Sequence, residues 1–303
     1  MDENAILDIV NSHYNIRFDR IEFIRESGSY AYALYSGKTK YFLRITKPMY
    51  SNTALQSLNI HLFLQENGFS VPEIIFTKEA TAYITSTDAA GAHYYVVYEF
   101  IEGDEVDPES NAENIGDFIG KLHSIMQHYT GDLPKYGKEF YIDRYINILN
   151  KKNYPNANEF ATYGDIIWDR LKDLPMAPCH GDMYRGNILQ TAEGRMYLLD
   201  FDTFCIGFPM YDATLICNMT DYFNYSPDGL ENTLNIYSRF LPHYTKRNPV
   251  SQKELDCMCD LMALYHYSLQ ATIIELYGID CVDINFLDRQ LDWLMKWEAQ
   301  CAK

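Results

Sequence analysis

The stretch from Cys179 to Asp202 constrains the fold and chemistry of this 303-residue chain more than any other. It contains Asp182, then Asn187 five positions later, and Asp200 eighteen positions after Asp182. Between Asn187 and Asp200, two short β-prone runs flank a turn at Gly194, which predicts a hairpin. Because a hairpin brings its two ends side by side, we expect Asn187 and Asp200 to meet, with Asp182 on the loop before them.

Two carboxylates and an amide in this order suit phosphoryl transfer. Mg²⁺ prefers oxygen ligands, usually one or two carboxylates together with phosphate oxygens and water. Asn187 and Asp200 can supply such oxygens, which leaves Asp182 to accept the proton of an attacking hydroxyl. A lone Asp-x-x-x-x-Asn match is weak, but the hairpin and the second Asp favour a catalytic loop over a chance match.

The protein kinase catalytic loop, His-Arg-Asp-x-x-x-x-Asn followed by Asp-Phe-Gly, has the same order of residues. Here the loop begins His180-Gly181-Asp182, and Asp200-Phe201-Asp202 follows the hairpin. This pair of motifs resembles the aminoglycoside phosphotransferase and choline kinase family of small-molecule kinases. The resemblance implies an α+β, two-lobed protein-kinase-like fold. Its N-terminal lobe would hold an antiparallel sheet plus one helix, and its C-terminal lobe would be mostly helical.

Composition and charge narrow the choice of partners. The chain is 47% hydrophobic, which is typical of a globular protein. A net charge of −17 argues against nucleic acid as a partner and is compatible with a cationic substrate. No apolar run is long enough to span a membrane, and the acidic N-terminus lacks the form of a signal peptide.

The seven cysteines are scattered and contain no Cys-x-x-Cys pair. Reduced, buried cysteines in a cytoplasmic protein are the simplest interpretation.

The N-terminal, nucleotide-binding lobe is expected over residues 1–102. Helical periodicity predicts helices over 2–14 and 52–67, and β-prone runs predict strands over 21–25, 30–35, 41–46, 71–76, 83–85 and 93–98. By resemblance, the turn that contains Ser29 covers the ATP phosphates.

Arg44 lies where a small-molecule kinase usually carries a Lys that holds the α- and β-phosphates. An Arg keeps the charge and offers a planar fork to phosphate oxygens. The family helix usually pairs this Lys with a Glu, whereas here the expected inward positions hold Gln56 and Asn59. The sequence therefore predicts that Arg44 has an amide partner or none.

The apolar run 96–103 ends in a glycine and resembles the hinge that precedes the second lobe. By similarity, the carbonyl of Glu99 and the amide of Ile101 would bond the adenine edge. The catalytic and substrate-binding helical lobe is expected over residues 103–303. Its predicted helices cover 112–129, 141–149, 158–174, 213–219, 230–241, 253–277 and 284–299.

Supporting roles follow from the resemblance for His180 and Asp212. Asp212 would brace the catalytic loop by accepting backbone amides, although an Asp at a helix N-terminus is also explained by capping. His123 is interpreted as a packing or surface residue, because no metal-ligand set surrounds it.

The leading functional interpretation is a Mg²⁺-dependent transfer of the γ-phosphoryl of ATP or GTP to a small-molecule hydroxyl. Acidic and aromatic residues after Asp200 suit a cationic amino alcohol or aminoglycoside. The predicted acceptor residues are Asp221, Tyr225, Tyr265, Glu275 and Asp292.

Two alternatives remain open. A protein serine/threonine kinase of the same fold ranks lower, because an Arg before Asp182 and an Ala-Pro-Glu segment are absent. A non-catalytic, nucleotide-binding pseudokinase is favoured by Arg44 and the missing helix Glu. The intact set of Asp182, Asn187 and Asp200 argues against it.

Overall fold

The computed structural model describes residues 2–26 and 28–302 and separates into two compact units. Unit 1 comprises Met1–Val106 together with Gly186–Asp202, and unit 2 comprises Asp107–Arg185 together with Thr203–Lys303. The predicted division at residue 102 differs from this one by four residues. It also differs at the 186–202 segment, which groups with the N-terminal unit although it lies far along the chain.

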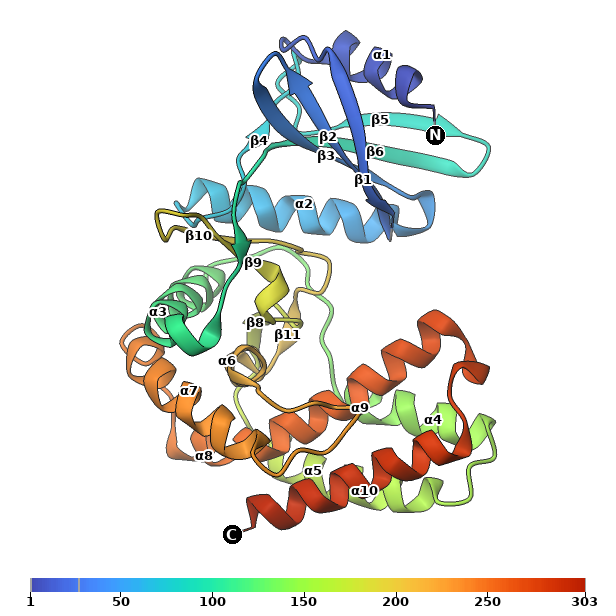
Figure 1. Ribbon diagram of the computed structural model, residues 1–303, viewed down its shortest axis with the longest axis vertical. Coiled ribbons are helices and arrows are strands. Elements are labelled where there is room, and N and C mark those ends of the chain that lie inside the picture. Colours follow the sequence, from blue (N-terminus) through green and yellow to red (C-terminus); the bar gives the residue numbers. More distant parts are fainter. Residues whose placement is uncertain (1, 27, 303) are drawn as a thin grey trace. The chain divides into compact units, whose positions relative to one another are not determined.

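Unit 1 is built on a six-stranded antiparallel sheet of order β1-β2-β3-β6-β4, with β5 paired to β6 (Figure 1). Its helices and these strands are α1 (Glu3–His13), β1 (Arg20–Glu26), β2 (Ser29–Ser36), β3 (Thr39–Thr46), α2 (Ser51–Glu66), β4 (Ile74–Ile75), β5 (Ile84–Asp88) and β6 (Gly91–Glu99). A short 3₁₀ turn, Pro48–Tyr50, leads into α2.

The alternation of side chains along the strands decides which helix each residue faces. Leu43 and Ile45 of β3 pack in one cluster with Val10 of α1. On the other face, Val96 of β6 packs with Leu58 of α2, and Figure 1 shows the two helices on opposite sides of the sheet. Arg44 lies between Leu43 and Ile45 and pairs with Val96, so its side chain points to the α2 face.

A second, three-stranded sheet of order β10-β9-β7 completes unit 1. Its strands are β7 (Asp104–Glu105), β9 (Ile188–Gln190) and β10 (Met196–Leu198). The hairpin predicted around Gly194 is therefore confirmed, with Ile188 opposite Leu198. The close approach of β9 to the chain before β7 requires Gly103, since a Cβ there would lie 2.6 Å from the carbonyl oxygen of Gln190.

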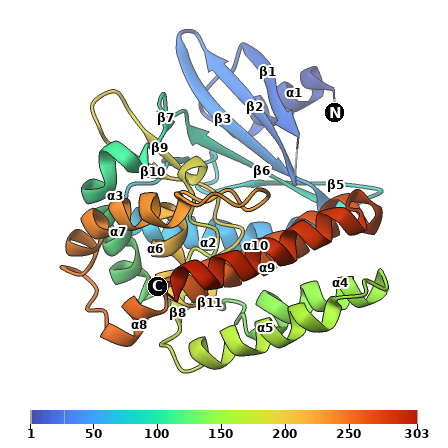
Figure 2. The same cartoon turned by 60° about the horizontal axis from the view of Figure 1, so that its bottom comes forward.

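Unit 2 is mostly helical. Its elements are α3 (Pro108–Met126), a π-helical turn (Glu139–Asp143), α4 (Arg144–Lys151), α5 (Ala157–Leu171), β8 (Ala177–Cys179), β11 (Cys205–Gly207), α6 (Pro209–Cys217), α7 (Gly229–Tyr244), α8 (Gln252–Asp256), α9 (Met258–Tyr277), a 3₁₀ turn (Ile279–Cys281) and α10 (Ile284–Cys301). Helix α9 contacts α4, α5, α6 and α10 (Figure 2). The short strands β8 and β11 pair antiparallel, and in the sequence they flank residues 180–204.

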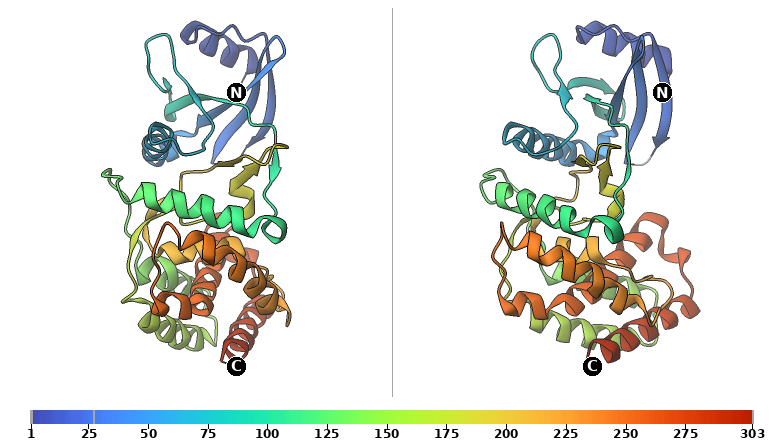
Figure 3. Two further views of the ribbon diagram at one scale, coloured as in Figure 1. Left: turned by 90° about the vertical axis from the view of Figure 1, so that its left-hand side faces the viewer. Right: turned by 60° about the vertical axis from the view of Figure 1, so that its left-hand side comes forward.

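Helices α3 and α7 lie against each other, as both views of Figure 3 show. Two glycines of α3 permit this approach, because Gly116 faces the carbonyl oxygen of Phe240 and Gly120 faces Tyr244. A Cβ at Gly120 would lie 3.1 Å from the Tyr244 carbonyl oxygen. The packing holds Tyr244 against α3, which matters for the catalytic loop below.

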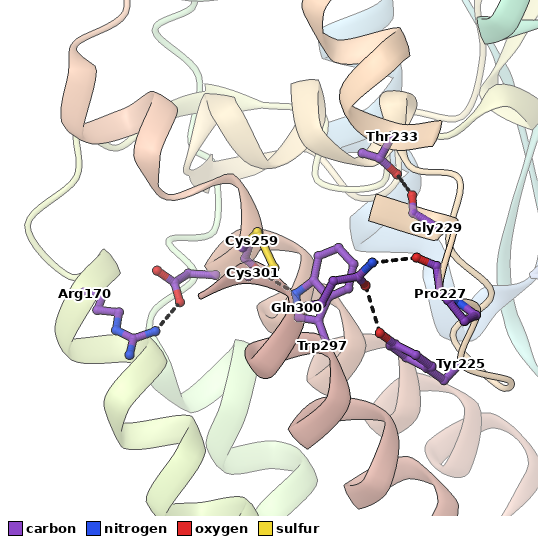
Figure 4. Close-up of a disulfide and its surroundings, with 10 residues drawn as sticks. Arg170, Tyr225, Pro227, Gly229, Thr233, Cys259, Trp297, Gln300 and Cys301 are labelled. Atoms are coloured by element: carbon purple, nitrogen blue, oxygen red, sulfur yellow. Dashed lines mark hydrogen bonds and ion pairs between the residues drawn. A yellow bond between two sulfur atoms is a disulfide. The ribbon is translucent and has the colours of Figure 1, made fainter. Parts of the chain in front are cut away.

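Cys259 of α9 and Cys301 at the end of α10 form a disulfide (Figure 4). Beside it, Gln300 accepts a hydrogen bond from Tyr225 and donates one to the Pro227 carbonyl. The prediction that the cysteines are reduced is therefore wrong for this pair, and the prediction that they are buried is wrong for Cys281, which is free but exposed.

Element types follow the predictions closely, while several boundaries do not. The helix predicted from residue 112 begins at Pro108, where Asp107 caps it. The helix predicted over 253–277 breaks at Cys257 into α8 and α9. The strand predicted over 71–76 contains only Ile74 and Ile75. Among the described residues, no helix is long and apolar enough to cross a membrane.

Candidate active site

The β9–β10 hairpin brings the predicted metal residues to one end of unit 1. Asn187 directly precedes β9, and its carbonyl oxygen accepts a hydrogen bond of 2.8 Å from Leu199 N–H. Asp200 is the next residue after Leu199. The hairpin ladder thus extends one bond beyond Ile188 and Leu198, and this bond fixes the backbone of Asn187 beside that of Asp200.

Asp200 has a backbone conformation that few residues adopt. Its φ of 57° lies in the left-handed region, where a non-glycine residue costs about 1–2 kcal/mol. Asp and Asn tolerate this region better than other side chains. The Asp200 carboxylate also accepts a hydrogen bond of 3.4 Å from Asp202 N–H. Strained backbone of this kind gathers at functional sites, where the surrounding structure maintains it.

The donor atoms at this end of the hairpin fit Mg²⁺. Asn187 and Asp200 offer one amide oxygen and one carboxylate, and Mg²⁺ is commonly held by one or two such groups plus phosphate oxygens and water. Among residues 2–26 and 28–302, no group of three or more His, Cys, Asp or Glu side chains could hold a metal ion. A metal bound mainly through substrate phosphates needs no such group.

The part of the predicted catalytic loop that lies in unit 2, from His180 to Arg185, is anchored by Asp212 of α6. The fully buried Asp212 carboxylate accepts hydrogen bonds from His180 N–H at 2.6 Å and from Gly181 N–H at 2.9 Å. Asp182 N–H in turn donates to Nδ1 of the buried His180 at 3.3 Å. The backbone that carries Asp182 is therefore held from two directions.

A histidine that was expected only to pack or to lie on the surface completes this anchor. His123 of α3 is buried, and its Nε2 lies 3.0 Å from Asp212 Oδ2. Its Nδ1 lies 2.8 Å from the Tyr244 hydroxyl of α7. The interpretation of His123 as a packing residue agrees with its burial, but it missed these two hydrogen bonds. The chain Tyr244–His123–Asp212 joins residues far apart in sequence, so no local pattern could have revealed it.

Gly181 has to be a glycine for two separate reasons. Its φ is +82°, and a Cβ at this position would lie 2.5 Å from the Thr203 carbonyl oxygen. Any side chain here would displace the loop segment between His180 and Asp182.

We therefore expect Gly181→Ala to lower stability by about 1–3 kcal/mol and to lower kcat as well. Gly194→Ala is the matched control, because Gly194 has a φ of +84° but no atom lies within 4 Å of the position that a Cβ would occupy. It should lose some stability and keep kcat. Thermal melts and steady-state kinetics check both variants, and equal kcat losses would contradict the role given to Gly181.

Two tyrosines, Tyr265 and Tyr211, lie close enough to Asp182 for its charge to affect their pKa values. Burial raises the pKa of Tyr265 well above its ordinary value, and the Asp182 carboxylate raises it further. The pKa of the buried Tyr211 is raised in the same way, with burial as the larger cause. Asp182 is itself half-buried. Both phenols therefore stay protonated at neutral pH, and the Tyr211 hydroxyl lies 2.9 Å from Ser268 Oγ.

Arg44 is paired differently from the prediction. Its guanidinium donates to the Asp202 carboxylate and, through Nε, to Ser29 Oγ at 3.3 Å. The inward residue of α2 is Ser57, which donates to the other oxygen of Asp202, whereas Asn59 is exposed. The predicted amide partner is therefore wrong. The error arose because the α2 face was placed one residue out of register.

A pocket of about 250 Å³ opens in unit 2 beside the residues that follow Asp182. It is lined by charged side chains at the start of α3 and in the loop, by three tyrosines, and by the end of α6: Asp107, Pro108, Glu109, Tyr184, Arg185, Leu215, Ile216, Asn218, Met219, Tyr222 and Tyr265. Tyr265 lines this pocket and lies close enough to Asp182 for its pKa to be affected by the carboxylate. Of the five predicted acceptor residues, Tyr265 is the one that lines the pocket.

The model of the phosphotransferase enzyme family, APH, matches residues 21–250. The chain belongs to this family. It is therefore a phosphotransferase by family, and its sheet-bearing and helical units form the α+β protein-kinase-like fold predicted from the sequence. An uncharacterized protein of Synechocystis sp., sll1119, is 19% identical over 312 residues, covering 97% of this chain and 84% of that protein.

Three solved structures show the same fold. The amicoumacin kinase hAmiN, in complex with AMP-PNP, Ca²⁺ and Ami, matches with a TM-score of 0.76 and 18% identity over 99% of this chain and 94% of that one. A microcompartment-associated aminopropanol kinase matches at 0.66 and 15%, over 99% and 96%. The choline kinase LicA from Streptococcus pneumoniae matches at 0.64 and 19%, over 99% and 98%.

The other predicted acceptor residues of this phosphotransferase have partners elsewhere in unit 2. Asp221 accepts from Phe223 N–H and Asn224 N–H within its own turn. Tyr225 donates to Gln300, Glu275 accepts from Arg144, and Asp292 pairs with Lys296 one helical turn away. These contacts stabilise the helices and loops of unit 2, and none of the four residues lines the pocket.

The predicted adenine contacts lie in the segment that leaves the sheet of this phosphotransferase. Glu99 is the last residue of β6, and its N–H donates to the Glu73 carbonyl at 2.8 Å. Ile101 follows in irregular chain before β7. Their contacts with a base stay predictions.

Proposed function

We propose that this phosphotransferase moves the γ-phosphoryl group of ATP or GTP to the hydroxyl of a small molecule that carries an amine. The observation that supports this most strongly is the anchored loop, in which Asp212 and His180 fix the backbone of Asp182. A general base must be held in place, and the family's motif puts the base at this position.

In the proposed reaction, the acceptor oxygen attacks the γ-phosphorus as the bond to the β–γ bridging oxygen breaks. The hydroxyl proton passes to the Asp182 carboxylate, and the nucleoside diphosphate leaves with the bridging oxygen. Arg44 holds phosphate oxygens. Asn187 and Asp200 would hold Mg²⁺, which would offset the negative charge on the phosphates.

The pocket beside Asp182 is the proposed acceptor site. Three charged residues line it: Asp107 and Glu109 are acidic, and Arg185 is basic. The charge of Arg185 contributes to lowering the pKa of Asp107, after the larger effect of the Ser110 hydroxyl. Among the described residues, no side-chain partner of Glu109 is found. Glu109 and the ring faces of the pocket tyrosines thus suit an ammonium group.

We expect Glu109→Gln to raise the acceptor KM by about two- to fivefold, because an exposed ion pair contributes up to about 1 kcal/mol. Rising salt should weaken acceptor binding in the wild type and have less effect in this variant. Asp292→Asn is the matched control, since it removes an exposed carboxylate that lies outside the pocket. A preferred acceptor that is neutral or anionic, or a KM indifferent to salt, would contradict a cationic acceptor.

A phosphotransfer screen tests the proposed function directly. Amino alcohols, aminoglycosides, choline-like compounds, homoserine, macrolides and sugars would be offered with ATP and GTP in parallel, and phosphorylated products would be identified by mass spectrometry. We expect an ester of an amine-bearing alcohol. Transfer to a protein serine or threonine instead, or nucleotide binding with no transfer to any class, would overturn the proposal.

A further inference from the structure

In unit 1, the Arg44 guanidinium pairs with the carboxylate of Asp202, which follows the β9–β10 hairpin. Arg44 is largely buried, with 20% of its side chain exposed, so its charge needs a nearby partner. Helix α2, which packs over this face of the sheet, has no carboxylate to offer in its interior. Its single acidic residue is Glu66, the last residue of the helix.

We propose that Asp202 is a positioning residue for Arg44, which sets the guanidinium in place for the phosphates. This inference rests on the phosphate-binding role proposed for Arg44. One Asp202 oxygen accepts from Arg44 Nη2, and Ser29 Oγ accepts from Arg44 Nε, so two fixed acceptors define the plane of the guanidinium. A guanidinium has five N–H donors. Those not aimed at Asp202 and Ser29 remain for phosphate oxygens.

Asp202 also joins three elements of unit 1. Its second oxygen accepts from Ser57 Oγ of α2, and its own N–H donates to the Asp200 carboxylate at 3.4 Å. The strand that carries Arg44, the helix α2 and the proposed metal residue Asp200 therefore meet at one aspartate. Because Arg44 and Ser57 each donate to one of its two oxygens, Asp202 is assigned to Arg44, and the cycle below distinguishes this role from that of a metal ligand.

A double-mutant cycle separates these roles. Affinity for Mg-ATP would be measured by calorimetry for Arg44→Ala, Asp202→Ala and the double variant. If Asp202 acts through Arg44, each single change weakens affinity by about tenfold or more, and the double variant binds no more weakly than Arg44→Ala. If Asp202 were a metal ligand, the two losses would multiply and the Mg²⁺ half-saturation would rise. That result would overturn the proposal.

A stability cycle keeps the inference testable without nucleotide. Asp202→Ala should lower the melting temperature less in the Arg44→Ala background than in the wild type, because the unpaired buried cation is then gone. Asp104→Ala, which removes an exposed carboxylate of β7, should have the same effect in both backgrounds. Equal losses for Asp202→Ala in both backgrounds would overturn the pairing. If the wild type bound no nucleotide, the proposed function would fail, and the stability cycle would still decide this inference.

Discussion

Asp182→Asn is expected to lower kcat by a factor of about 10²–10⁴, the range that a positioned general base contributes. The amide has the shape of the carboxylate but cannot accept the proton of the acceptor hydroxyl. The Asp182 backbone hydrogen bond to His180 does not involve the side chain, so the loop should keep its conformation. Single-turnover kinetics with a saturating acceptor would measure the loss.

The same variant should bind Mg-nucleotide nearly as tightly as the wild type and melt at nearly the same temperature. Asp173→Asn is a suitable control, because Asp173 is an exposed carboxylate of unit 2 that pairs only loosely with Lys253 at 3.9 Å. It should leave kcat unchanged. If Asp182→Asn kept more than a small fraction of the wild-type kcat, Asp182 would not be the base.

Asp200→Asn should lose activity for a different reason, because it should bind the Mg²⁺-nucleotide complex more weakly. Replacing a carboxylate ligand by an amide removes charge that holds Mg²⁺, and kcat/KM should fall by about a hundredfold or more. We choose Asn because Asp200 has a φ of 57°, which Asn adopts more readily than Ala. The backbone and the fold are thereby kept.

Titrating Mg²⁺ against nucleotide affinity distinguishes the two variants. The Mg²⁺ half-saturation should rise strongly in Asp200→Asn and stay at its wild-type value in Asp182→Asn. An unchanged half-saturation in Asp200→Asn would show that another residue holds the metal.

Local signals were enough to predict most of the fold. The β-prone run 41–46 predicts a strand, and the glycine at 194 predicts the turn that makes the β9–β10 hairpin. These are contacts between near neighbours, which sequence patterns record directly. The spacing of Asp182, Asn187 and Asp200 was informative for the same reason, because one loop and one hairpin connect them.

The remaining features depend on contacts between distant residues. Asp202 meets Arg44 across 158 positions, and His123 meets Asp212 across 89. No periodicity reports such pairs, so Arg44 was expected to have an amide partner or none, and His123 was given no partner. The expected inward positions of α2 were Gln56 and Asn59, whereas the side chain that contacts Asp202 is that of Ser57, one position after Gln56. The same limit applies to the disulfide, whose cysteines are 42 residues apart.

The acceptor pocket illustrates the limit of composition as a guide. Aspartates and tyrosines after Asp200 were grouped because their chemistry suits a cation, yet most of them stabilise helices and turns. Glu109 was missed because it lies before the catalytic loop, at the start of α3. The available signal was Pro108, because a proline is common in the first turn of a helix. It marks the start of α3, where Glu109 lies.

The most direct test of the account follows the γ-phosphoryl group itself. ATP or GTP labelled with heavy oxygen on the γ-phosphate would be incubated with Mg²⁺, the acceptor found in the screen, and either the wild type or Asp182→Asn. We predict a labelled phosphate ester on the acceptor hydroxyl with the wild type and almost none with the variant. Label found only in inorganic phosphate, or an equal yield of ester from both proteins, would contradict the account.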